Sequence, residues 1–271
     1  MSLPLAQPDR IALITGASSG IGAELARELA ERGQNVALVA RSTDKLVDLA
    51  QELQGLGVRA EVLQTDLSNR SERAALPGRI DELGLWVSIL VNNAGLSTMG
   101  RVHHADPDAE MNMIEVDVMA VADLCTRFLP TMVEKRSGAV LNVASTAAFQ
   151  PIPGQAGYAA SKSFVLSYTH ALAGELRGTN VTATALCPGP VRTGFGDAAG
   201  ISQQDAESAL PRFMWEPAPA VARCGVDAMA AGRTVAIPGV ANQVTAFFGD
   251  HIPRRLLMPL MASKHPGMRR D

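Results

Sequence analysis

The sequence predicts an α/β fold: a doubly wound, mainly parallel seven-stranded sheet with helices on both faces, in three layers. Short β-branched runs alternate regularly with longer stretches of helical spacing, which is typical of chains that build parallel sheets. Several of these runs are apolar almost throughout, as expected of strands buried on both faces. The expected strands cover residues 10–16, 35–41, 58–66, 87–95, 138–145, 181–189 and 233–239.

The chain has no sharp shift in composition, so we expect one domain over residues 1–271. The alternation is interrupted in two places, which we interpret as a substrate lid at about 192–216 and a C-terminal extension at about 240–271. Two explanations of the apolar lid side chains stay open: packing onto the sheet, or covering an apolar substrate. Those side chains belong to Phe195, Leu210, Phe213, Met214 and Trp215.

The composition excludes several functional classes. A net charge of −3 gives no reason to expect a nucleic acid partner. Cys125, Cys187 and Cys224 lack the spacing of a zinc site or a disulfide framework, which favours a reducing, cytoplasmic location. The neighbouring His103 and His104 have no partner ligands in the sequence nearby, so no metal is expected. We see no signal peptide and no apolar run of about 18 residues, the minimum for a spanning helix.

A glycine-rich turn, ITGASSGIG, follows the first expected strand and opens the first helix. Glycine lets the backbone approach a pyrophosphate closely, and a helix N-terminus supplies free N–H groups and a positive dipole. The spacing is GxxxGxG rather than the GxGxxG of many Rossmann dinucleotide sites. We therefore expect the turn to bind a dinucleotide through Gly16, Ser18, Ser19, Gly20, Ile21 and Gly22.

Arg41 and Ser42 stand at the end of the second strand, where doubly wound folds meet the adenosine ribose. An acidic residue there would accept a hydrogen bond from a 2′-hydroxyl, whereas arginine suits a 2′-phosphate. The first carboxylate comes only at Asp44. The sequence thus favours NADP(H) over NAD(H).

Tyr158 and Lys162 are four residues apart on an expected helix and therefore share one face. Ser145 stands thirteen residues before Tyr158, at the carboxyl end of the fifth strand. The three side chains can converge on one carbonyl: Ser145 would hold its oxygen, and Tyr158 would donate a proton to it. Lys162 favours the phenolate and would lower the high pKa of a free phenol.

The motifs TGxxxGxG, NNAG, a serine thirteen residues before YxxxK, and PGPVRT, in this order, resemble the short-chain dehydrogenase/reductase family over about 10–240. The resemblance implies hydride transfer between a nicotinamide and a carbonyl or alcohol. It implies that Lys162 also holds the nicotinamide ribose. Further cofactor contacts implied by it are Asp66 and Leu67 at the adenine, Asn93, Ala94 and Gly95 along the cleft, and Pro188, Gly189, Val191 and Thr193 at the carboxamide end.

One position departs from that family. An asparagine usually follows NNAG in the next helix and completes a proton relay with the lysine, and this chain has Asp117 in that place. Asp117 is therefore included among the expected catalytic residues. Two roles stay open: relay through its backbone carbonyl, or a direct pairing of its carboxylate with Lys162 that alters the charge balance.

The expected activity is NADPH-dependent reduction of a carbonyl. A weaker resemblance to long-chain 3-oxoacyl and mycolate reductases and hydroxysteroid dehydrogenases implies an apolar, lipid-like ketone or 3-oxoacyl group, and lipid metabolism. Alternatives are an NAD-dependent alcohol, sugar or steroid dehydrogenase, and a non-catalytic protein that senses dinucleotides. The family also implies a homo-oligomer. The basic tail 251–270 could contact a membrane surface, cap the substrate mouth or join subunits.

Overall fold

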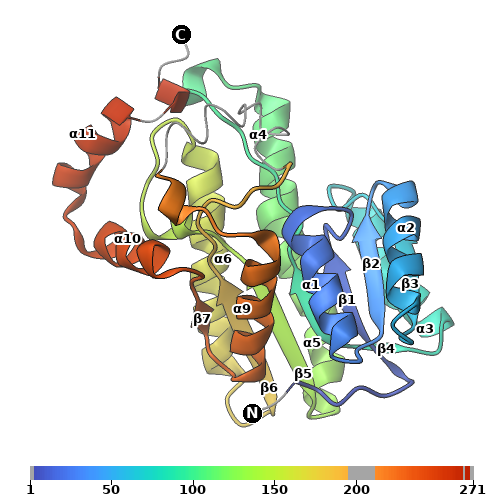
Figure 1. The fold of residues 1–271 in the computed structure, drawn as a ribbon. Helices are drawn as coiled ribbons and strands as arrows, with labels where there is room; N and C mark the ends of the chain where they lie inside the picture. The colour runs from blue at the N-terminus through green and yellow to red at the C-terminus, as the bar shows by residue number, and fades with distance from the viewer. Residues whose placement is uncertain (1–2, 195–210, 265, 269–271) are drawn as a thin grey trace.

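The computed structural model describes residues 3–194, 211–264 and 266–268. A seven-stranded parallel sheet with the order β3-β2-β1-β4-β5-β6-β7 forms its centre, as predicted (Figure 1). The strands are β1 (Arg10–Thr15), β2 (Val36–Ala40), β3 (Ala60–Gln64), β4 (Trp86–Asn92), β5 (Gly138–Val143), β6 (Val181–Leu186) and β7 (Val235–Ala236). The order reverses between β1 and β4, which places the usual ligand crevice at the carboxyl ends of these two strands.

Helices cover both faces of the sheet and form two cores with it. One core contains side chains of α1 (Gly20–Glu31), α2 (Thr43–Gln54) and α9 (Ala218–Ala230). The other contains side chains of α3 (Arg70–Glu82), α5 (Ala120–Glu134) and α6 (Ala156–Glu175). The strands between them are nearly fully buried, which accounts for their continuous apolar runs.

The long helical stretch expected near 109–136 is not one regular α-helix. It consists of α4 (Pro107–Ile114), a π-helical segment η2 (Glu115–Met119) and α5. Arg73 on α3 fixes this segment by ion pairs with Glu115, at 2.6 Å, and with Asp123, at 3.1 Å. A π-helical turn shifts the side chains that follow it, and such turns are frequent at functional sites. Asp117 lies in the middle of this one and is fully buried.

Short 3₁₀ turns flank the carboxyl edge of the sheet: η1 (Val102–His104), η3 (Thr146–Phe149) and η4 (Arg212–Met214). The strand expected at 233–239 is reduced to the two residues of β7, and α10 (Val240–His251) begins directly after Gly239, whose φ is +81°.

The C-terminal extension is formed by α10, α11 (Arg254–Lys264) and η5 (Pro266–Met268). Figure 1 places α10 and α11 at the edge of the molecule beyond β7. The turn η5 contacts the loop before η1, since Arg101 donates to the Met268 carbonyl at 3.3 Å. Within the described residues, none of the helices is long and apolar enough to cross a membrane.

Candidate active site

Tyr158 and Lys162 lie one turn apart on α6, as their spacing predicts. The helix begins at Ala156, after a turn in which Gly154 has φ +87°. The Lys162 ammonium is buried and lies 5.6 Å from the centre of the Tyr158 ring. Its Nζ also donates a hydrogen bond to the Val143 carbonyl on β5, at 3.3 Å. Lys162 is thus held in place beside the phenol rather than exposed to solvent.

Ser145 joins this pair from the end of β5. Its hydroxyl hydrogen-bonds the Tyr158 side chain, and its Oγ accepts from the Ala147 N–H at 3.1 Å. The carbonyl of Pro188, after β6, lies 3.5 Å from the same Oγ. The structure therefore brings together the serine, tyrosine and lysine that the sequence places on two separate elements.

Asp117 contacts Lys162 directly. Its Oδ2 lies 2.9 Å from the Lys162 Nζ, and both side chains are almost fully buried. The other oxygen, Oδ1, accepts from the backbone N–H of Leu96 at 2.7 Å. The structure contains the direct pairing of the Asp117 carboxylate with Lys162, which was one of the two roles considered from the sequence. Leu96 as its second partner was not predicted, because the contact depends on the π-helical turn.

Gly95 leaves the room that this ion pair occupies. A Cβ at this position would lie 3.1 Å from both the Lys162 Nζ and the Asp117 Oδ2. Such contacts are tighter than side chains normally make, so a larger residue would displace the pair. The glycine of NNAG, expected to line the cofactor cleft, thus also leaves space for the pair of Asp117 and Lys162.

The pKa values in this cluster show how burial and charge compete. Desolvation raises the pKa of Tyr158, and the charge of Asp117 adds to this rise. The charge of Lys162 and the hydrogen bond from Ser145 oppose it. Lys162 therefore acts in the predicted direction, but the net shift of the phenol is upward, in contrast to the lowered value that the sequence suggested. For Lys162 itself, desolvation lowers the pKa, but Asp117 and Tyr158 outweigh this and raise it. Lys162 is thus protonated at neutral pH.

Asp117 has a raised pKa as well, because desolvation outweighs the attraction of Lys162. Its negative charge keeps the Tyr158 phenol protonated to higher pH than Lys162 alone would allow. This charge is absent when asparagine occupies the position. The substitution therefore changes the electrostatics of the site and not only its hydrogen bonds.

We expect Asp117→Asn to shift the acid limb of the pH profile for alcohol oxidation to lower pH. Oxidation needs the phenolate, so its rate rises with pH through the pKa of Tyr158. Removal of the Asp117 charge lowers that pKa, while the amide can still accept from Leu96. Turnover at the optimum is expected to be retained or raised. The profile of kcat/KM against pH checks this, and a shift to higher pH would contradict the assigned sign.

The glycine turn after β1 packs against the residues that follow β4. Gly16 and Gly20 have φ of +66° and +56°, which favour glycine. A Cβ at Gly22 would lie 2.3 Å from the Gly16 carbonyl oxygen. Asn93 supports the turn, since its Nδ2 donates to the Thr15 carbonyl at 2.9 Å and to the Gly16 carbonyl at 3.3 Å. Asn93 thus acts through the turn, which the sequence analysis did not foresee.

Thr15 is a further residue that sequence reasoning missed. Its buried hydroxyl accepts from the backbone N–H groups of Asn93 and Ala94, at 2.9 and 3.0 Å. The side chain joins the carboxyl ends of β1 and β4 at the point where the strand order reverses. Its place directly before the first glycine was the available signal.

The N-terminus of α1 is open toward the crevice. Ser19 is exposed at the N-cap and, within the described part of the chain, its side chain makes no capping bond to the helix. Ser18 and Ile21 are partly buried beside it. The first turn of α1 therefore keeps backbone N–H groups available for an anion.

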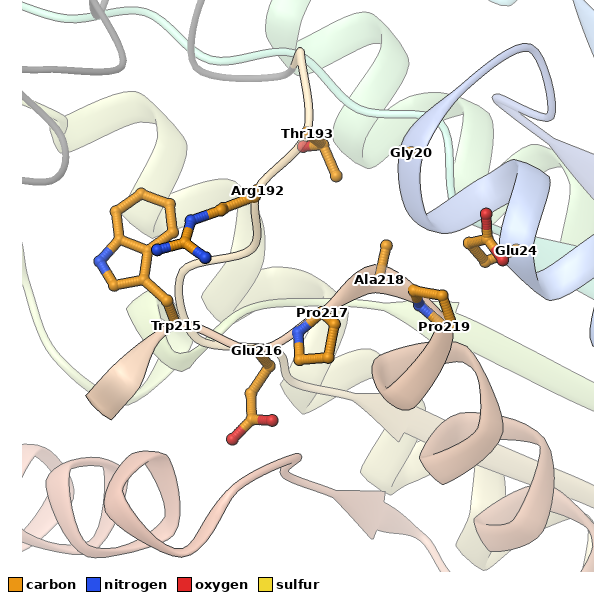
Figure 2. A pocket seen from close by; sticks show the side chains of 9 residues that line it. All are labelled: Gly20, Glu24, Arg192, Thr193, Trp215, Glu216, Pro217, Ala218 and Pro219. Atoms are coloured by element: carbon orange, nitrogen blue, oxygen red, sulfur yellow. The ribbon is translucent and has the colours of Figure 1, made fainter. Parts of the chain in front are cut away.

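A cavity of about 570 Å³ borders this turn (Figure 2). In Figure 2, Gly20 and Thr193 face each other across its upper part, and Arg192 lies beside the Trp215 ring. A Cβ at Gly20 would lie 3.1 Å from the Thr193 side chain, so glycine keeps this gap open. Ser145, Tyr158 and Lys162 do not line this cavity. The candidate catalytic site is therefore located by the contacts among these three side chains and not by the cavity.

The adenosine end is less enclosed. Arg41 and Ser42 are exposed directly after β2. Asp66 Oδ1 accepts from the N–H and hydroxyl of Ser68, at 2.9 and 2.8 Å. Desolvation raises the pKa of Asp66, but these bonds and the nearby Arg41 outweigh it and lower the pKa. Leu67 is buried and its carbonyl accepts from Arg73.

The PGPVRT turn after β6 meets the site through its backbone. Gly189 lies against Asn242, whose Oδ1 would be 2.2 Å from a Cβ there. Asn242 is fully buried and donates to the carbonyls of Met214 and Pro238, at 3.0 and 3.1 Å. Val191 pairs with Glu216 as an isolated parallel bridge. Asn242 therefore links the turn to Met214 and to Pro238, a role not predicted from sequence.

Most of the predicted lid, residues 195–210 with Phe195 and Leu210, lies outside the described residues. Phe213 is strongly exposed, whereas Met214 and Trp215 are partly buried. His103 and His104 are exposed on η1 with their rings 4.2 Å apart, and they are not brought to Tyr158 by any contact within the described part.

A family model described as short chain dehydrogenase matches residues 10–203. The chain belongs to the short-chain dehydrogenase family. It is 35% identical over 189 residues to a putative ketoacyl reductase of Streptomyces coelicolor, covering 69% of this chain and 72% of the relative. As a member of this family the protein is an oxidoreductase.

Two solved structures of family members support the same fold. A short-chain dehydrogenase from Sphingobium yanoikuyae in complex with NADPH has a TM-score of 0.79 and 32% identity, over 92% of this chain and 95% of that one. A short chain dehydrogenase/reductase from Burkholderia phymatum in complex with NAD has a TM-score of 0.81 and 28% identity, over 95% and 96%. Similar structures thus hold either dinucleotide.

The residues present fit a dinucleotide. Gly16 lies close to Ala94, and Gly22 lies close to the Gly16 carbonyl, so a side chain at either glycine would collide with backbone at the turn. The open N-terminus of α1 lies beside it, and the exposed Arg41 stands at the far end of the crevice. Gly16 to Gly22 would hold the pyrophosphate, and Lys162 and Thr193 the nicotinamide half.

Proposed function

We propose that this oxidoreductase reduces a carbonyl to an alcohol with NADPH, with Tyr158 as the proton donor. The observation that carries this proposal is the cluster of Ser145, Tyr158 and a buried, charged Lys162 at the carboxyl end of β5. A surface tyrosine–lysine pair would leave the ammonium in water. Here it is buried and lies 5.6 Å from the centre of the phenol ring, which supports a chemical role.

A nicotinamide held by these residues would supply the hydride for the carbonyl carbon. Ser145 donates a hydrogen bond to the carbonyl oxygen and positions it near the phenol. Tyr158 transfers its proton to that oxygen, and the negative charge that this leaves on the phenolate is stabilised by Lys162. Asp117 and the Val143 carbonyl hold the ammonium in position meanwhile. A proton from water then restores the phenol.

The preference for NADP(H) rests on Arg41. It is exposed directly after β2, and the first carboxylate that follows this strand is Asp44. The planar guanidinium of Arg41 suits a 2′-phosphate. The similar structure with NADPH agrees with this preference, while the one with NAD keeps the NAD-dependent alcohol or sugar dehydrogenase as the second candidate.

We expect Arg41→Asp to reverse the cofactor preference. The variant loses a charge-assisted bond to the 2′-phosphate and gains an acceptor for a 2′-hydroxyl. Such a bond contributes about 1.5–3 kcal/mol, so the ratio of kcat/KM for NADPH to that for NADH should fall by at least about tenfold. Arg177→Asp, at the exposed C-terminal end of α6, is the control for net charge. An unchanged ratio in Arg41→Asp would refute the assignment.

We infer an apolar substrate, a lipid-like ketone or a 3-oxoacyl group. The similarity to a ketoacyl reductase supports this class, as do the apolar side chains of the proposed lid at 192–216. The end of the C-terminal extension packs close to the turn before Tyr158. Gly267 packs against Gly154 and Met99, and Arg101 donates to the Met268 carbonyl at 3.3 Å. Turnover of 3-oxoacyl thioesters of graded length, compared with small ketones and steroids, tests this class.

A non-catalytic dinucleotide sensor is the candidate from a different class. The intact contacts among Ser145, Tyr158 and Lys162 speak against it, because sensing needs no proton donor. Binding of NADPH without turnover of any carbonyl would favour the sensor.

A further inference from the structure

Helix α10 exposes an apolar stripe. Val240, Val244, Phe247 and Phe248 are 75%, 48%, 58% and 53% exposed. Their spacing of four, three and one residues places them on one side of the helix, within about 100° of its circumference. A surface helix normally turns such a stripe toward the core. In α10 it faces solvent.

The opposite side of α10 is anchored in the protein. Asn242, Ala246 and Gly249 are buried there. Gly249 lies against the Gln150 side chain, and Asn242 bonds the carbonyls of Met214 and Pro238. These contacts fix the rotation of the helix about its axis. The outward direction of the stripe is therefore a property of the folded chain.

Exposed apolar side chains are concentrated in this region. The described residues contain thirteen large hydrophobic side chains that are exposed, and five of them lie between 240 and 256. The fifth is Leu256 on α11, at 65% exposure. A scattered exposed leucine needs no explanation, but a cluster on one element marks an interaction site.

Basic residues follow the stripe in the sequence. Arg255 is exposed at the start of α11, Arg254 bonds the Phe149 and Gly249 carbonyls, and the sequence 251–270 has five Lys/Arg and no acidic residue. Two acidic residues offset part of this charge: Asp250 near the end of α10, and Glu216, whose side chain lies against Gly239 directly before Val240. An apolar face edged by Lys/Arg is the pattern of helices that lie in the interface of an anionic membrane.

The same extension reaches the rim of the active site. Arg254 donates to the carbonyls of Phe149 on η3 and of Gly249, at 3.2 and 2.7 Å. Further along, Gly267 packs on Gly154, four residues before Tyr158. In Figure 1, α10, α11 and η5 follow one another along this side of the molecule. A surface bound to the stripe would thus lie on the side of the molecule that carries the site rim.

We propose that the stripe of Val240, Val244, Phe247 and Phe248, together with the exposed Arg255 and Leu256 that follow it on α11, docks onto an anionic lipid bilayer. The helices lie on the bilayer and do not cross it. If the proposed function holds, an apolar substrate can pass from the lipid to the site along the C-terminal extension. Docking itself needs no turnover, so it can be tested whether or not the protein proves to be a lipid-ketone reductase.

Co-sedimentation of the full-length protein with vesicles tests the proposal. We expect strong binding to vesicles of phosphatidylcholine and phosphatidylglycerol in equal parts, weak binding to phosphatidylcholine alone, and release by high salt. The double variant Val244→Gln/Phe247→Gln should weaken binding at least tenfold, because it removes two apolar side chains from the buried surface. Arg255→Gln should weaken it about fivefold.

Leu56→Gln is the matched control, since Leu56 is 53% exposed but lies just after α2. It should bind vesicles like the unchanged protein. Circular dichroism melting and NADPH binding verify that each variant is folded. Failure of the folded protein to bind anionic vesicles overturns the proposal. A second outcome also overturns it: light scattering shows a dimer for the unchanged protein and a monomer for the double variant, and neither binds vesicles. In that case a second copy of the chain covers the stripe.

Discussion

Tyr158→Phe is expected to reduce kcat for carbonyl reduction by about 10²–10⁴-fold, the range of general acid catalysis by a positioned side chain. The phenylalanine ring fills the same space but has no proton to donate. NADPH binding should change little, because the glycine turn and Arg41 are untouched. Single-turnover kinetics at saturating NADPH, together with cofactor titration by fluorescence, measure the two effects separately.

Tyr168→Phe provides the matched control. Tyr168 is the second of the two tyrosines in the chain and lies on the same helix, ten residues further on. It packs against the core formed with α3, α5 and α6, away from Ser145. We expect it to keep nearly full activity. Equal activity of Tyr158→Phe and the unchanged protein would refute Tyr158 as proton donor.

Lys162→Met is expected to lower the free energy of unfolding by about 3–5 kcal/mol and to abolish most of the activity. The change leaves the Asp117 carboxylate buried without its counter-charge, 2.9 Å from where the ammonium was. Because the pKa of Lys162 is raised in the folded state, its stabilising contribution is complete below its ordinary value of 10.5 and is lost as the pH rises through the higher, folded value. Urea denaturation at pH 7 therefore measures the full effect.

The double variant Lys162→Met/Asp117→Asn separates stability from catalysis. It removes both charges and keeps an acceptor for the Leu96 N–H. Since a buried pair can be replaced by neutral groups with little loss, most of the stability should return. Activity should not return, because no cation remains beside Tyr158. Recovery of activity in the double variant would exclude an electrostatic role for Lys162.

The sequence predicted the sheet well because its signal is local. Runs such as 10–16 and 138–145 are buried on both faces, so their apolar composition directly reflects their environment. The pairing of Tyr158 with Lys162 was equally accessible, since a spacing of four on a helix fixes a shared face. The contact of Ser145 with this pair was also predictable, because Ser145 stands at the carboxyl end of β5.

Contacts between distant segments could not be predicted in the same way. The sequence left the pairing of Asp117 with Lys162 open as one of two roles, and residues 115–119 carry no local signal for the π-helical turn that contains Asp117. Thr15 and Asn242 act as hydrogen-bond clamps between strand ends and turns, and their types are common in core positions. The upward shift of the Tyr158 pKa arises from burial and from Asp117 together, which only the folded arrangement reveals.

We propose that the cluster around Tyr158 catalyses the reduction of an apolar carbonyl with NADPH as the hydride donor. Incubation of the purified protein with NADPH and 3-oxoacyl thioesters of graded length, with quantification of both NADP⁺ and the hydroxyacyl product, tests it most directly. We predict one alcohol formed for each NADPH oxidised, with kcat/KM rising with chain length. A protein that binds NADPH but converts none of the thioesters, ketones or steroids to an alcohol would contradict the account.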